Sequence, residues 1–166
     1  MPVPPLMIIS NTSPLIKLAA VEHLDLLAVL YGTVVIPAQV HDEYRAGMST
    51  GDPDLGDLPW LVVEDVTISA DLLAIPSLGA GEAAVITLAQ ARAAQLVILD
   101  DHAARRAAQM RNLTVTGTYG VLITAKQLGH IAALRPILDR MIAQGRRISA
   151  SLRADLLRLA GESDEQ

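Results

Sequence analysis

Acidic and amide side chains follow short apolar runs at several points along this chain. Two of them, Asp100 and Asp101, stand side by side directly after the apolar residues 96–99. If these runs are strands of one parallel sheet, their carboxyl ends share a crevice, so side chains far apart in sequence meet there. Gathered carboxylates need a cation, and the pattern therefore predicts a magnesium-type site. The residues expected at it are Asn11, Glu43, Glu82, Asp100 and Asp101.

Glu82 is the most informative of these residues. It begins a stripe with Ile86, Ala89 and Ala93 on a predicted helix, so it should point the way the buried side chains point. A glutamate in the first turn is also favoured by the helix dipole, and this purely structural explanation stays open for Glu82 alone.

Asp100 and Asp101 should have different roles if the strand before them continues. Successive residues of a strand point to opposite faces, so only one of the pair can share the direction of Glu82. Asp101 precedes His102, Ala103 and Ala104, a good position for a helix N-cap. We expect one aspartate to be a ligand and the other a cap, without deciding which.

The types of side chain expected at the site indicate which cation it would bind. The chain has no cysteine, and its four histidines show no metal-ligand spacing. Oxygen donors of this kind fit Mg²⁺ or Mn²⁺ rather than Zn²⁺. Mg²⁺ usually keeps water ligands and takes further oxygens from a phosphate substrate, so a phosphate-bearing substrate is expected.

The charge is divided unevenly along the chain, although the net charge is only −5. Residues 1–100 hold 3 Lys and Arg against 12 Asp and Glu, whereas residues 101–160 hold 10 against 3. An acidic half with the candidate site joined to a basic half suits a polyanionic substrate. Arg105, Arg106 and Arg111 are the predicted nucleic-acid contacts. The alternative is that the arginines of this half, such as Arg105, Arg106, Arg146 and Arg147, lie on solvated helix faces.

Strands and helices alternate in the pattern. β-branched and apolar runs at residues 7–10, 33–36 and 96–99 predict core strands, with a peripheral strand at 60–66 and a short last one at 113–115. Helical stretches are predicted between these runs. The first follows residues 11–14 and includes Leu15, Leu18, Leu26, Leu27 and Leu30, and the others follow Pro37, follow Gly81 and surround Arg105. Three more helical stretches are predicted at the end of the chain. This alternation favours an α/β fold, a parallel sheet with right-handed crossovers and helices on both faces.

The length of 166 residues fits one globular domain. We expect a main domain at residues 1–148, with a helix and acidic tail at 149–166 packed on it. No apolar run approaches the roughly 18 residues that would span a bilayer. The beginning of the chain lacks the basic flank of a signal peptide, so we expect a soluble, cytoplasmic protein without membrane contact.

Five motifs occur in the order seen in PIN-domain proteins. They read ISNTSPLI (9–16), VHDE (40–43), LGAGEA (78–83), LDD (99–101) and VTGT (115–118). Over residues 7–146 the chain resembles the prokaryotic branch of that family, whose members are described as predicted nucleic-acid-binding proteins.

The resemblance implies a three-layer Rossmann-like PIN fold, with a parallel sheet of four or five strands and helices on both faces. It also implies a Mg²⁺- or Mn²⁺-dependent endoribonuclease acting on RNA, often the toxin of a toxin–antitoxin pair with an antitoxin protein as partner, and a homodimer in many members. By position, Asn11, Glu43, Glu82 and Asp101 match the acidic quartet of the family. Asp100 lies beside it, Ser13 and Thr118 supply hydroxyl support, and Glu82, Asp101 and Glu43 would hold the metal.

Asn11 departs from the aspartate usual at the first position. An amide oxygen can still bind a metal, but one negative charge is lost and cation binding should weaken. The alternative hypothesis is therefore a non-catalytic module that binds RNA or protein. A phospho-acceptor receiver domain is disfavoured, because it would need an acidic pair where this chain has Ser10 and Asn11.

Overall fold

A five-stranded parallel sheet forms the centre of the protein, in a computed structural model that describes residues 6–163. The strand order is β3-β2-β1-β4-β5, and every neighbouring pair is parallel. The strands are β1 (Ile8–Ser10), β2 (Val34–Pro37), β3 (Leu61–Glu64), β4 (Leu96–Ile98) and β5 (Val115–Thr116). The predicted parallel α/β sheet is thus confirmed.

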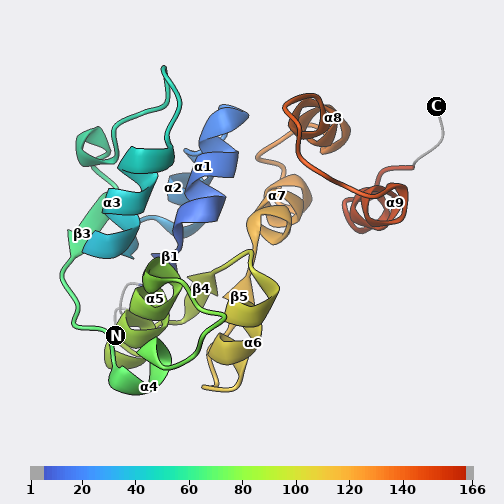
Figure 1. The fold of residues 1–166 in the computed structure, drawn as a ribbon. Helices are drawn as coiled ribbons and strands as arrows, with labels where there is room; N and C mark the ends of the chain where they lie inside the picture. Colours follow the sequence, from blue (N-terminus) through green and yellow to red (C-terminus); the bar gives the residue numbers. More distant parts are fainter. Residues whose placement is uncertain (1–5, 164–166) are drawn as a thin grey trace, which may run out of the picture.

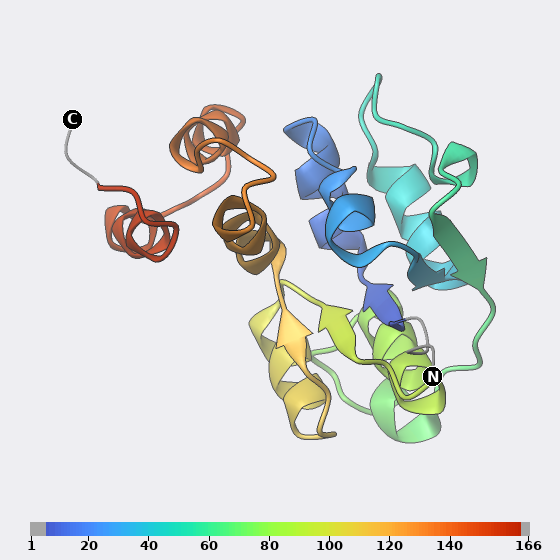
Figure 2. The same ribbon diagram turned by 180° about the vertical axis from the view of Figure 1, so that it is seen from behind.

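Helices cover both faces of the sheet. Figure 1 shows α1 to α3 on one side of the strands and α4 to α6 on the other, and the view from behind in Figure 2 shows the same layers. The helices are α1 (Thr12–Ala20), α2 (Leu26–Tyr31), α3 (Ala38–Gly47), α4 (Ala70–Leu73), α5 (Ala80–Ala91), α6 (His102–Gln109), α7 (Thr118–Gln127), α8 (Arg135–Ala143) and α9 (Ala150–Leu159), with a 3-10 turn η1 (Leu55–Asp57). The result is the expected three-layer arrangement.

The direction of the chain across the sheet reverses between β1 and β4. From β1 the chain continues to β2 and β3 on one side, and returns through α5 to β4 and β5 on the other. Such a reversal leaves a crevice at the carboxyl ends of the two neighbouring strands. The backbone N–H of Asn11 donates to the carbonyl of Ile98 at 3.0 Å, so the two strand ends are joined directly at this point.

The pattern of burial explains why the core strands read as apolar runs. All residues of β1 and β2 are buried, as expected for strands covered on both faces. Val62 and Val63 in β3 are exposed, which agrees with its place at the edge of the sheet and with the predicted peripheral strand.

The first helical stretch is interrupted, although the sequence suggested a continuous one. The interruption lies between α1 and α2, where Glu22 adopts a left-handed backbone conformation with φ 60°. There the N–H of Glu22 donates to Ala19 and that of His23 to Leu18, which closes α1 before its apolar pattern ends. The short helix α4 is a second difference, because the sequence pattern did not predict it.

The last three helices are linked by polar contacts as well as by packing. The carboxylate of Glu162 accepts from the backbone N–H groups of Leu134 and Arg135 at the beginning of α8. The side chains of Lys126 and Gln127 in α7 donate to carbonyls at the end of α9. The proposed division at residues 148 and 149 within one domain stays a prediction, and residues 1–5 and 164–166, including the end of the acidic tail, lie outside the described part.

Among the helices of residues 6–163, none has both the length and the apolar character needed to cross a membrane.

The segment between α3 and β3 is anchored by one buried hydroxyl. Tyr44 is fully buried, and its hydroxyl donates to the carbonyl of Pro53 at 2.9 Å. Burial, together with the negative charges of Asp52 and Asp54, raises the pKa of Tyr44 to about 12, so it remains a donor at neutral pH.

Replacing Tyr44 with phenylalanine should lower the free energy of unfolding by about 1 kcal/mol, because the Pro53 carbonyl loses its donor. Urea denaturation followed by circular dichroism measures the change. Tyr31→Phe is the control, since the hydroxyl of Tyr31 makes no hydrogen bond within residues 6–163, and equal stability loss in both variants would contradict the anchoring role.

Candidate functional site

A cavity of about 560 Å³ lies at the carboxyl ends of β1 and β4. All five residues predicted from the strand ends line it, and so does Ser13. The acidic and amide residues are Asn11, Glu43, Glu82, Asp100 and Asp101. Two cations also line the cavity, Lys17 from α1 and Arg146 from the segment after α8. The parallel sheet therefore brings together side chains from both the acidic and the basic half of the chain.

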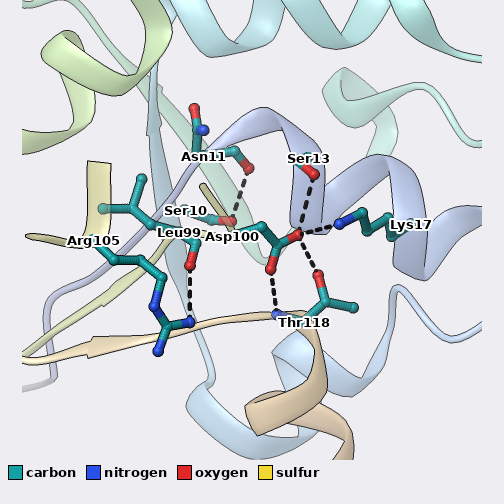
Figure 3. A network of polar contacts seen from close by, with 8 residues as sticks. All are labelled: Ser10, Asn11, Ser13, Lys17, Leu99, Asp100, Arg105 and Thr118. Atoms are coloured by element: carbon teal, nitrogen blue, oxygen red, sulfur yellow. Dashed lines mark hydrogen bonds and ion pairs between the residues drawn. The ribbon is translucent and has the colours of Figure 1, made fainter. Parts of the chain in front are cut away.

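Asp100 has the most complete set of partners in the cavity. Its Oδ1 accepts from the backbone N–H of Thr118 at 2.7 Å. Its Oδ2 accepts from the hydroxyls of Thr118 at 2.7 Å and Ser13 at 3.1 Å, and lies 3.1 Å from Nζ of Lys17 (Figure 3). Four donors from α1 and α7 thus converge on one carboxylate.

These partners keep Asp100 ionised. Burial acts to raise the pKa of Asp100, but the Thr118 N–H, the Lys17 charge and the Thr118 hydroxyl together outweigh it and lower the pKa below its ordinary value of 3.8. A carboxylate that is already paired with a cation has less capacity to bind a metal ion.

Gly117 permits this close approach. A Cβ atom at Gly117 would lie 2.9 Å from Oδ1 of Asp100 and 2.6 Å from Nη1 of Arg105, closer than real side chains come. This explains physically why a glycine stands between Thr116 and Thr118 in the motif.

Asp101 is the N-cap of α6, as one of the two sequence hypotheses allowed. Its Oδ2 accepts from the N–H of Ala104 at 3.0 Å. Asp100 nevertheless also faces the cavity. The strand β4 ends at Ile98, so the alternation of side chains along a strand does not apply to this pair.

Glu43 connects α3 to the beginnings of two other helices. Its carboxylate accepts from the hydroxyl of Thr12 at 2.7 Å and from the N–H of Gly81 at 3.0 Å. A Cβ atom at Gly81 would lie 2.4 Å from Oε2 of Glu43, so a side chain there would displace the Glu43 carboxylate from this position.

Glu82 is only partly satisfied. Its Oε1 accepts from the N–H of Gly79 at 2.9 Å, whereas its Oε2 is buried and makes no hydrogen bond within the described residues. Burial is the main cause that raises the pKa of Glu82 above its ordinary value; the Gly79 N–H opposes this, and repulsion from Asp101 and Glu43 adds to it. This carboxylate therefore lacks a positive partner.

Asn11 has a similar unsatisfied oxygen. Although it occupies the N-cap position of α1, its side chain makes no capping hydrogen bond. Its side chain Oδ1 is buried without a partner among residues 6–163, while its carbonyl accepts from the hydroxyl of Ser10 at 3.0 Å (Figure 3). A buried acceptor without a donor lowers the free energy of unfolding. A donor or cation from outside the chain would satisfy the oxygens of both Asn11 and Glu82.

These residues fit a hard divalent cation. In the part of the chain that the structure describes, no group of three or more His, Cys, Asp and Glu side chains forms a metal-binding cluster. The donors here are instead an amide oxygen, from Asn11, beside the carboxylates of Glu82 and Asp101. Mg²⁺ commonly binds through one or two carboxylates, with waters and substrate phosphates completing its shell, so this smaller set suffices.

The three arginines predicted to bind nucleic acid do not line the cavity. Arg105 donates to the carbonyl of Leu99 at 3.3 Å, Arg106 lies beside His102, and Arg111 forms an ion pair with Asp71 at 3.0 Å. Their role in binding stays a prediction.

The sequence analysis missed Lys17 as a site residue. A signal was present, because Lys17 follows Ser13 by four residues on the predicted helix and therefore lies on the same face. The contribution of Arg146 had no comparable local signal.

The fold and cavity together define an α/β protein with an acidic site at the switch point of a parallel sheet. A family model described as a PIN domain matches residues 7–162. The chain therefore belongs to the PIN-domain family, as the sequence motifs predicted. PIN domains have a nuclease-like fold, generally act as nucleases on nucleic acid, and typically use divalent metals. A search of curated proteins found no match to this chain.

Replacing Lys17 with methionine tests the Asp100 network. The variant loses a cation that lowers the pKa of Asp100, so this pKa should rise. The stabilisation from ionised Asp100 is fully present above the unfolded pKa of 3.8 and is lost as the pH falls through the lower folded value. Urea denaturation should show a loss of about 2 kcal/mol at neutral pH and a weaker decline in acid than in wild type.

Arg158→Met is the control for this substitution. It removes an exposed ion pair with Asp155, and should change stability by less than about 0.5 kcal/mol. An unchanged acid dependence in Lys17→Met would contradict the role given to the Lys17 ion pair.

Proposed function

We propose that this protein is a Mg²⁺- or Mn²⁺-dependent endoribonuclease. The observation that carries the proposal is a pair of buried oxygens, Oδ1 of Asn11 and Oε2 of Glu82, that have no hydrogen-bond partner among residues 6–163 and lie in a cavity lined by further carboxylates. Acceptors without donors, in a chain of the PIN-domain family, are what a bound cation would satisfy.

In this proposal Asn11, Glu82 and Asp101 hold the ion, with Glu43 beside them. The ion, when bound, activates water for attack on a phosphodiester and offsets the charge of the leaving oxygen. Glu43 fixes the beginnings of α1 and α5 through Thr12 and Gly81, and so keeps the ligands at their separation. Ser13 and Thr118 hold Asp100 at the cavity wall.

RNA is the proposed substrate. A role as the toxin of a toxin–antitoxin pair, with an antitoxin protein and a second copy of the chain as partners, is a further part of the proposal and rests on the family resemblance. Each of these partners would be detected by co-purification from the native host.

A non-catalytic module is the second candidate function. Two features favour it: Asn11 removes a negative charge from the cavity, and Lys17 neutralises another on Asp100. Such a module would retain RNA with no dependence on Mg²⁺, and metal-dependent cleavage would exclude it.

Replacing Glu82 with glutamine should weaken Mn²⁺ binding at least about tenfold, because it removes the charge of a ligand without changing its shape. Calorimetric titration of Mn²⁺ into the pure protein measures the affinity, and cleavage of a labelled RNA measures the activity, which should fall with it. Asp155→Asn, at an exposed ion pair with Arg158, should behave as wild type. Equal RNA cleavage by wild type and Glu82→Gln would exclude this cavity as the nuclease site.

Replacing Asn11 with aspartate separates the two candidate functions. The added carboxylate should raise the Mn²⁺ affinity about tenfold, and should lower the melting temperature without metal, because it adds charge beside Glu82. If wild type cleaves no RNA and Asn11→Asp does, the non-catalytic module is the correct account of the natural chain. If both cleave, with a lower metal requirement in Asn11→Asp, the nuclease proposal is supported.

A further inference from the structure

Arg146 lines the cavity and is held in place by the end of α8. The N–H of Arg146 donates to the carbonyl of Met141 at 3.0 Å, and that of Gly145 donates to Ile142 at 3.0 Å. Gly145 has a left-handed φ of 95°. Together these form a Schellman motif, which closes the helix and sets the direction in which the chain leaves it. The backbone position of Arg146 is therefore determined by the helix end rather than by a loose loop.

The end of α8 is in turn fastened to the end of α1. Gln144 Nε2 donates to the carbonyl of Ala20 at 2.7 Å, and Nη1 of Arg140 lies 3.1 Å from the carboxylate of Glu22. Because α1 also carries Lys17, both cations of the cavity are placed by helices that are bonded to each other.

The two cations differ in what they contact. Lys17 is paired with Asp100. The side chain of Arg146 lines the same cavity but makes no hydrogen bond or ion pair with any residue between 6 and 163, although four carboxylates share the cavity with it. The charge of Arg146 acts on the neighbouring Tyr119: burial chiefly raises the pKa of Tyr119 and the Asp100 charge adds to this, while Arg146 acts to lower it.

An arginine that is left without a carboxylate partner in an acidic cavity has its donors available for an anion. The planar guanidinium presents paired N–H donors that match the oxygens of a phosphate. Arg105 and Arg111 lack this freedom, since one donates to Leu99 and the other pairs with Asp71.

We propose that Arg146 binds a non-bridging phosphate oxygen of the RNA strand in the cavity, so that the α8–α9 segment takes part in substrate binding. This inference rests on the proposed function. Among the described residues, the cavity then combines acceptors without a donor, at Asn11 and Glu82, with a guanidinium without a carboxylate partner, at Arg146. A phosphodiester with its associated cation would satisfy both.

The test is the binding of a labelled single-stranded RNA oligonucleotide, measured by fluorescence anisotropy at several salt concentrations. Ca²⁺ replaces Mg²⁺ to fill the oxygen site, and a gel after each titration confirms that the RNA is intact. Arg146→Met should weaken binding about tenfold and reduce the slope of log affinity against log salt by about 0.7, the value for one lost contact with a single strand. Arg146→Lys keeps the charge and should restore most of the slope.

Arg147→Met is the matched control, because Arg147 is the exposed neighbour and does not line the cavity. It should leave affinity and slope close to wild type. Equal losses in Arg146→Met and Arg147→Met, or no loss in either, would overturn the inference while leaving the nuclease proposal intact. Failure of wild type to bind RNA at all would overturn both the inference and the nuclease proposal. If Arg146→Met loses RNA binding but wild type shows no cleavage, the role of Arg146 in RNA binding is supported and the non-catalytic module is favoured.

Discussion

The buried carboxylate of Asp100 is the contact on which the arrangement of this site depends. It follows β4, and it receives donors from two helices that are distant in sequence, α1 through Ser13 and Lys17 and α7 through Thr118. Without these donors, burial would raise the pKa of a carboxylate at this depth. With them it stays charged and fixes α1 and α7 relative to the central strands, and the rest of the cavity is built around that fixed point.

The remaining acceptors of the cavity are satisfied unequally. Asp100, Asp101 and Glu43 have donors within the chain, whereas Asn11 and Glu82 each keep a buried oxygen that has no donor in the described part of the chain. Folding therefore leaves a local electrostatic cost at two adjacent strand and helix ends. A site of this kind lowers the stability of the fold but can bind a cation, as is common at functional sites of enzymes.

The positions of the C-terminal helices show how the positive charges of the basic half are distributed. The basic half does not form one positive surface over α6 and the turn after it, because Arg105 and Arg111 are engaged with neighbouring groups. Besides Asp101, it contributes the cation Arg146 to the acidic cavity, through a helix end bonded to α1. In this member of the PIN-domain family the C-terminal helices thus extend the site as well as the core.

The sequence by itself determined the fold class and the acidic and amide residues of the cavity lining. Apolar runs that end at Asn11 and Asp100 predict parallel strands, and the carboxyl ends of parallel strands meet at one edge. Only the tertiary structure decided which oxygens are satisfied, since the donors come from far away in the chain; Ser13 and Asp100, for example, are 87 residues apart. The same holds for Arg146, whose place depends on the contacts of Gln144 and Arg140 with the end of α1. Periodicity reports which face of an element is buried, whereas hydrogen-bond partners and charge pairing depend on distances that exist only after the elements have packed.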